Sequence, residues 1–125
     1  MARNLQVQKR VQAEIDHELG KNKPNFSNRK ILKYTDAVIC EIQRVASLVP
    51  FLPHRVINTV KVRGYTIPEN SIVFPNSLAV HRDPKIWKDP EHFNPDHFYD
   101  ENSKSLINTD RLISFGMGII NHDDL

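Results

Sequence analysis

Apolar side chains at helical spacing mark two segments of the chain. Within residues 2–19 they recur at every fourth position, with polar and charged residues between them. Within residues 36–48 they follow the i, i+4, i+7, i+8, i+11 spacing of one buried helix face. Each segment is therefore predicted to be an amphipathic helix. The apolar residues are Val7, Val11, Ile15 and Leu19 in the first segment, and Val38, Ile42, Val45, Ala46 and Val49 in the second.

The residues at the ends of these segments agree with the helical pattern. Gly20 is suited to a left-handed C-cap of the first helix. Thr35 is predicted to N-cap the second helix, and Asp36 would complement the positive end of its dipole. Pro50 ends the second helix, because a proline ring cannot continue the hydrogen-bond ladder. A short helical turn is expected between the two helices, at residues 28–33.

The period changes from helical to alternating after residue 54. Val60 and Val62 alternate with charged neighbours, and residues 55–65 and 71–74 are rich in Val, Ile and Thr. Glycine and proline turn signals separate these runs, which predicts short antiparallel strands. One more helical turn is expected at residues 76–81. The expected fold class is therefore mainly α with a small antiparallel β unit, an α+β arrangement.

Residues 83–100 read DPKIWKDPEHFNPDHFYD and contain three prolines and four aromatic residues. Rigid kinks combined with large apolar rings predict an ordered segment without regular structure, packed against the helices. Residues 101–110 are polar and are predicted to be mobile.

Composition narrows the class of protein. A chain of 125 residues that is 39% hydrophobic fits one domain. Its 17 Lys and Arg residues are balanced by 15 Asp and Glu residues and are scattered, so no nucleic-acid partner is expected. Cys40 is the only cysteine, which excludes an internal disulfide and predicts a small buried hydrophobe. No run of about 20 apolar residues is present, so no transmembrane segment is expected in this chain.

Glu41 and Arg44 form an E-x-x-R pair beside the apolar stripe of the second helix. An isolated pair of this kind is usually an exposed ion pair that contributes about 0.2–0.5 kcal/mol. Further motifs nevertheless follow it in a fixed order. They are Tyr65-Thr66-Ile67-Pro68, His81-Arg82-Asp83-Pro84, Pro95-Asp96-His97-Phe98 and Phe115-Gly116-Met117-Gly118.

Together these motifs resemble the C-terminal part of a cytochrome P450, closest to the microsomal drug- and steroid-oxidising group. The resemblance covers roughly residues 7–118, which correspond to about the last third of a complete member of the family. It implies a partial, incomplete cytochrome P450 domain at residues 1–118, followed by a divergent tail at residues 119–125.

The resemblance also implies roles for individual residues. Glu41 and Arg44 would hold their helix against the aromatic, proline-rich segment, together with His97 as the basic residue of that segment's P-x-x-F motif. His54 and Arg55 would be the candidates for contact with a haem propionate. The residues that would line the substrate pocket are Val49, Phe51 and Leu52.

The haem loop of the family has the pattern Phe-x-x-Gly-x-Arg-x-Cys-x-Gly and presents a cysteine thiolate to iron. Phe115, Gly116 and Gly118 match its beginning. Beyond them, Ile120, His122 and Asp124 stand where Arg, Cys and Gly are expected. The chain is therefore expected to supply no metal ligand and no catalytic residue, and an imidazole ligand from His122 is disfavoured.

The function implied by the resemblance is that of a haem-dependent monooxygenase. Such an enzyme oxidises lipophilic organic substrates with O₂ and electrons from a flavoprotein reductase, on the cytoplasmic face of the endoplasmic reticulum membrane. The chain itself is predicted to be an incomplete, inactive and cytoplasmic form. The alternative is a non-catalytic fragment that binds a reductase or a full-length relative. Lys85, Lys88 and Arg111 are candidate contributors to that binding surface.

A different hypothesis places a divalent metal among His81, His92 and His97, with nearby aspartates. The spacing from His92 to His97 is not a helical i, i+4 pair, and the prolines between these motifs prevent a regular face. This hypothesis is therefore not favoured.

Overall fold

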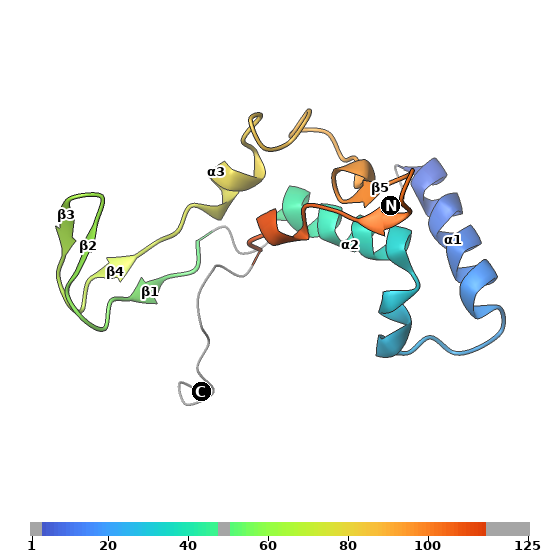
Figure 1. The fold of residues 1–125 in the computed structure, drawn as a ribbon, viewed down its shortest axis with the longest axis horizontal. Helices are drawn as coiled ribbons and strands as arrows, with labels where there is room; N and C mark the ends of the chain where they lie inside the picture. Colours follow the sequence, from blue (N-terminus) through green and yellow to red (C-terminus); the bar gives the residue numbers. More distant parts are fainter. Residues whose placement is uncertain (1–3, 48–50, 115–125) are drawn as a thin grey trace.

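The computed structural model describes residues 4–47 and 51–114. Two helices form the body, α1 (Leu5–Leu19) and α2 (Lys33–Ala46), and the 3-10 helix η1 (Phe26–Lys30) lies between them in the chain (Figure 1). The other elements, in chain order, are β1 (His54–Arg55), β2 (Val60–Val62), β3 (Tyr65–Ile67), β4 (Ile72–Val73), α3 (Ser77–His81), η2 (Pro95–His97), β5 (Tyr99–Asp100), β6 (Ser105–Leu106) and η3 (Thr109–Arg111).

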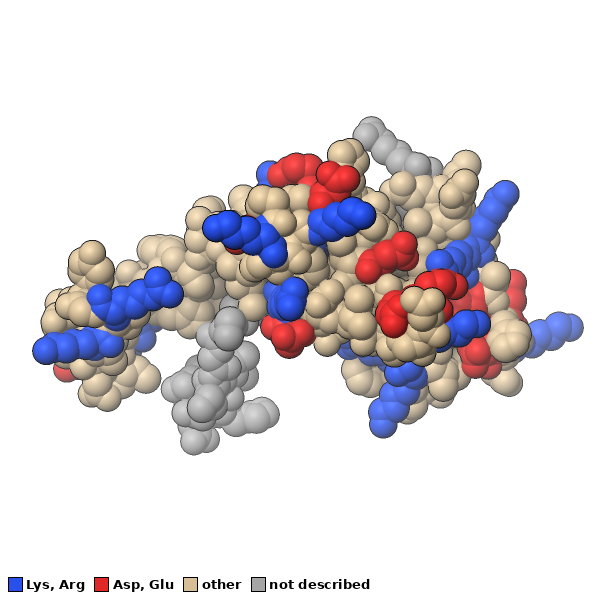
Figure 2. Space-filling view, turned by 45° about the horizontal axis from the view of Figure 1, so that its top comes forward, with Lys and Arg blue, Asp and Glu red and all other residues tan. Residues whose placement is uncertain are grey.

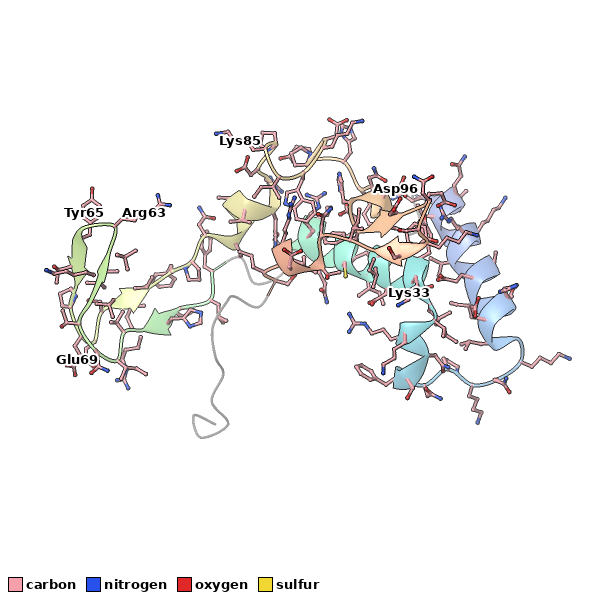
Figure 3. The ribbon with its side chains drawn as sticks, in the orientation of Figure 1. Lys33, Arg63, Tyr65, Glu69, Lys85 and Asp96 are labelled. Atoms are coloured by element: carbon pink, nitrogen blue, oxygen red, sulfur yellow. The ribbon has the colours of Figure 1, made fainter. Side chains whose placement is uncertain are left out.

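The strands pair as separate two-stranded antiparallel ladders, β1 with β4, β2 with β3, and β5 with β6. The first two ladders form an arm that extends away from the helical body, whereas β5 and β6 lie against α2 (Figure 1). Arg63 and Gly64 make the turn of the β2–β3 hairpin, with φ of 49° and 87°. Positive φ at both central residues gives the turn that matches the twist of a hairpin. Figure 3 shows Arg63 and Tyr65 at the far end of the arm.

These elements confirm the expected α+β class. The structure contains the first helix with Gly20 as its C-cap at φ 56°, the strands of the arm, and the helical turn now seen as α3. The helical turn expected at residues 28–33 is η1, which lies two residues earlier, and α2 already begins at Lys33.

The predicted N-cap of α2 is wrong. Thr35 lies inside the first turn, and the residue at the N-cap position is Leu32, whose side chain makes no capping bond. Glu14 of α1 takes over this role. Its carboxylate accepts hydrogen bonds from the backbone N–H groups of Tyr34 and Thr35, at 2.8 and 2.7 Å, and from the Thr35 hydroxyl at 2.6 Å. Helix N-termini favour such negative charge, so α1 and α2 are joined by a cap supplied from another helix.

The predicted buried face of α2 is also largely wrong. Val38 is buried, but Ile42 and Val45 are 39% and 36% exposed. The face that packs inward is instead the one that carries Glu41 and Arg44, because the 83–100 segment and β5–β6 cover that side of the helix. The buried residues of α2 are Tyr34, Asp36, Ala37, Val38, Cys40, Glu41 and Arg44.

The segment 83–100 is ordered and packed, as the sequence predicts. Trp87 and Phe98 are 1% and 0% exposed, and their ring centroids lie 5.0 Å apart. The Trp87 indole N–H donates to the carbonyl of Val80 at 2.9 Å, which fixes the segment against α3. The region predicted to be mobile, residues 101–110, instead contains β6, in which Leu106 pairs with Tyr99.

Among the helices that the structure describes, none has the length and apolar character that a membrane span requires.

Candidate functional site

Glu41 and Arg44 lie on the inward face of α2 with 0% and 1% of their surfaces exposed. The spacing of three residues on a helix places both side chains on the same face. Arg44 Nε donates to Glu41 Oε2 and Arg44 Nη2 donates to Glu41 Oε1, each at 2.8 Å. This is a two-point, charge-assisted interaction in the protein interior, not the exposed ion pair that is usual for an isolated E-x-x-R sequence.

The remaining N–H groups of Arg44 bind the backbone of the segment packed on α2. Nη1 donates to the carbonyls of His81 and Pro90 at 2.7 and 2.8 Å. Nη2 also donates to the carbonyl of His92 at 3.2 Å. A guanidinium has five N–H donors, and all five are used here. Arg44 thereby joins α2 to the end of α3 and to the 83–100 segment.

Glu41 binds the same segment through its carboxylate. Oε1 accepts the backbone N–H of Asn94 at 2.8 Å, and His97 Nδ1 lies 3.2 Å from both carboxylate oxygens. The other ring nitrogen of His97, Nε2, faces the carbonyl of Lys88. Both partners of this ring are acceptor groups, so His97 lies between the Glu41 carboxylate and the backbone of the 83–100 segment.

The structure thus brings Glu41, Arg44 and His97 together, and we call these three residues the buried charge cluster. Burying ions costs several kcal/mol each, and this cost is tolerable only where further hydrogen bonds satisfy them. In this cluster backbone groups from five positions of the 83–100 segment and its neighbourhood supply those bonds. Each charged group of the cluster is therefore engaged by several partners, and these contacts connect α2 to the end of α3 and to the 83–100 segment.

His81 occupies a second buried position next to the cluster, with 0% exposure. The backbone N–H of Ile113 donates to His81 Nε2 at 3.1 Å, so the neutral ring carries its proton on Nδ1. Nδ1 lies 3.2 Å from Ser47 Oγ, and the Ser47 hydroxyl donates to the carbonyl of Arg44 at 2.9 Å. Burial, assisted by the nearby charge of Arg44, lowers the pKa of His81. The sequence identifies this histidine as part of the His81-Arg82-Asp83-Pro84 motif and as a candidate metal ligand, but does not predict these contacts.

The other predicted site residues are not gathered at the cluster. His54 and Arg55 lie on β1, in the arm, and are exposed. Phe51 is 53% exposed and Leu52 is half-buried. The remaining predicted positions lie outside the described residues, namely Val49, Phe115, Gly116, Gly118 and His122.

The histidines of the metal hypothesis are not arranged around a common point. His81 and His97 engage both ring nitrogens in the contacts given above, and the side chain of His92 is 80% exposed. Within residues 4–47 and 51–114, no three His, Cys, Asp or Glu side chains are grouped so as to hold a metal ion.

The positive side chains expected to bind a partner are exposed. Lys85, Lys88 and Arg111 all lie at the surface, and Lys85 projects outward from the loop after α3 (Figure 3). Figure 2 shows positive and negative side chains interspersed over the body, without a large field of one sign on the visible face.

The sole cysteine is not available as a metal ligand. Cys40 is 4% exposed and belongs to the core of α2, packed with residues such as Ala37 and Phe98. Burial, together with the negative charge of Asp36, raises the pKa of its thiol. A thiol in this setting stays protonated, whereas binding to iron requires the thiolate. Its placement agrees with the prediction of a small buried hydrophobe.

Comparison with known proteins gives relatives over nearly the whole chain. Human cytochrome P450 2U1 is 39% identical over 120 residues, which are 94% of this chain and 22% of that protein. Rat cytochrome P450 2J3 is 38% identical over 120 residues, and mouse cytochrome P450 2B9 is 41% identical over 114 residues. These matches cover 24% and 23% of the two proteins, so the chain spans about a quarter or less of the length of its curated relatives.

The family model described as Cytochrome P450 matches residues 1–120, a stretch that contains the buried charge cluster and all elements of the described fold. On this evidence the chain belongs to the cytochrome P450 family.

Proposed function

We propose that these residues derive from a haem-dependent monooxygenase and that the 125-residue chain itself is an inactive form. The complete enzyme would oxidise lipophilic organic substrates with O₂ and with electrons from a flavoprotein reductase. Its place would be the cytoplasmic face of the endoplasmic reticulum membrane. Family membership supports the monooxygenase class, and because the chain spans only a part of its relatives, the activity belongs to the proposal.

The buried charge cluster is the observation that carries the first half of the proposal. Glu41 and Arg44 hold α2, the end of α3 and the 83–100 segment in one arrangement. An unpaired ion at this depth would strongly destabilise the folded chain. The two charges are therefore compatible with the fold only when the complete set of partners is in place.

The second half of the proposal concerns the sulfur ligand. A haem whose axial ligand is a thiolate supplies the electron density that favours cleavage of the O–O bond. The one cysteine of these 125 residues is Cys40, which is buried in the core of α2 and protonated. His122 stands at the position where the family pattern has the ligand. The residues present therefore do not fit a haem-thiolate centre, although His54 and Arg55 are exposed on β1 and free to contact a propionate.

The test is reconstitution of the 125-residue chain with haemin, followed by reduction and exposure to carbon monoxide. We expect no absorbance band of a thiolate-ligated ferrous carbonyl. The matched variant Cys40→Ala is expected to give the same spectrum. A thiolate band in the parent chain would overturn the proposed inactivity, and its loss in Cys40→Ala would identify Cys40 as the ligand.

A non-catalytic binding role is the second candidate, and exposed apolar side chains on α2 favour it. Ile39, Ile42 and Val45 are between 36% and 44% exposed and follow one another at helical spacing. Scattered single apolar residues are normal at a surface, but a continuous stripe is typical of an interaction face. Titration of the chain with a flavoprotein reductase tests this role. Saturable binding that weakens in Ile42→Glu, a substitution within this stripe, would support it, and the absence of binding would remove it.

A further inference from the structure

His81 is the point at which three separate parts of the chain meet. Its backbone carbonyl accepts from Arg44 on α2, its Nδ1 contacts Ser47 at the C-cap of the same helix, and its Nε2 accepts from Ile113. Ile113 is distant in sequence from both other partners and lies two residues after the end of η3. One imidazole thus joins the end of α2, the end of α3 and the segment after η3.

The geometry determines the protonation state of this ring. The Ile113 N–H can only donate, so Nε2 must be unprotonated and Nδ1 must carry the proton. The Ser47 hydroxyl donates to the carbonyl of Arg44, which leaves its oxygen to accept the Nδ1 proton. The ring, the hydroxyl and the carbonyl therefore form a directional chain of hydrogen bonds from Ile113 to the last turn of α2.

A protonated ring would break this chain. An imidazolium carries N–H on both nitrogens, so Nε2–H would face the Ile113 N–H and two donors would oppose each other. Arg44 on α2 is the charged group whose field acts on His81, and it opposes a second positive charge there. Ser47 is uncharged, and the segment after η3 presents a backbone amide. Every contact of the ring therefore favours the neutral form.

We propose that neutral His81, with its proton on Nδ1, is a positioning residue that fixes Ile113 against the C-terminus of α2. The sequence motif that begins with Phe115 starts only two residues further along the chain. His81 thus holds the backbone at Ile113 and releases it when the ring is protonated. The inference deepens the proposed function. Its test reads the backbone at Ile113 and not haem chemistry, so the two can fail independently.

The first measurement uses the ¹⁵N-labelled 125-residue chain without any substitution. Correlation spectra of the imidazole nitrogens are expected to show His81 protonated on Nδ1 and not on Nε2. The hydrogen-exchange protection of the Ile113 amide, corrected for the intrinsic rate, is expected to fall with decreasing pH at the midpoint at which His81 titrates. A proton on Nε2, or protection at Ile113 that does not follow the titration of His81, would overturn the proposal.

Two substitutions separate the two hydrogen bonds of the ring. In His81→Gln the side-chain carbonyl reaches the place of Nε2, so protection of Ile113 is expected to persist and to lose its dependence on pH. In His81→Asn the shorter amide reaches only the place of Nδ1, so protection is expected to fall roughly five- to tenfold. Equal protection in the two variants would contradict a positioning role. Fluorescence of the buried Trp87 reports whether each variant folds. If either variant unfolds, the pH dependence of Ile113 amide protection in the parent chain alone tests the proposal.

Discussion

Replacing Arg44 by lysine keeps the positive charge and removes the geometry of the buried charge cluster. The guanidinium makes five hydrogen bonds, two to Glu41 and three to the carbonyls of His81, Pro90 and His92. A lysine ammonium has three donors on one nitrogen, so at least two of these acceptors lose their partner. The acceptors are buried or partly buried and water has little access to replace the lost donors.

The expected loss follows from these contacts. A hydrogen bond to a charged group contributes about 1.5–3 kcal/mol, so two lost bonds amount to roughly 3–6 kcal/mol. Removal of one partner from a buried ion pair costs a similar ~3–5 kcal/mol. The complete free energy of unfolding of a domain is only about 5–15 kcal/mol. Arg44→Lys is therefore expected to remove a large part of the stability of the chain.

Urea unfolding, followed by the fluorescence of Trp87, measures this change. With a slope of about 1–3 kcal/mol per molar urea, the midpoint of Arg44→Lys is expected at least about 1 M below that of the parent. The control is Arg82→Lys, because Arg82 is a half-exposed arginine whose contact with Glu91 is 3.6 Å long. Its free energy of unfolding is expected to change by less than about 0.5 kcal/mol. Equal midpoints for the two variants would refute the assignment of Arg44 as a saturated buried donor.

Three further predictions concern other contacts. Glu14→Ala removes the cap of α2 and is expected to lower the free energy of unfolding, measured in thermal melts, by about 1 kcal/mol. Glu18→Ala, at an exposed position of α1, is the control and should leave the free energy of unfolding unchanged. The pKa of His81 is lowered in the folded chain, so the unfolded chain binds the extra proton and the free energy of unfolding should fall as pH decreases below about 6.5. His81→Gln should reduce this pH dependence, measured by urea titrations at several pH values. Trp87→Phe removes the indole donor to the partly buried carbonyl of Val80 and should cost about 0.5–1.5 kcal/mol by calorimetry, and an unchanged melting temperature would show that this bond is not made.

Periodicity predicted the helices and the arm because local spacing decides these elements. Gly20 and the turn at Gly64 could be predicted for the same reason, since a positive φ favours glycine. The N-cap of α2 could not be predicted from the local sequence. Thr35 has the right chemistry for a cap, but Glu14, twenty-one positions earlier in the chain, supplies the acceptor.

The orientation of α2 also could not be derived from its own sequence. The apolar stripe with Ile42 and Val45 is the stronger hydrophobic signal, yet the described residues pack on the flank that carries Glu41 and Arg44. Two charges can replace apolar residues at such positions only when distant backbone groups satisfy them. Those groups come from an irregular segment, whose carbonyl directions have no pattern in the sequence. The family resemblance identified the cluster, whereas hydrophobicity pointed to the other face.

Arg44 is a fully engaged guanidinium in the interior of a cytochrome P450 chain. NMR of the ¹⁵N-labelled protein tests it directly through the guanidinium protons. We expect separate, slowly exchanging Nη resonances for Arg44, because hydrogen bonds to Glu41 and to three carbonyls prevent rotation of the group. A single averaged Nη resonance, such as exposed arginines give, would contradict the account.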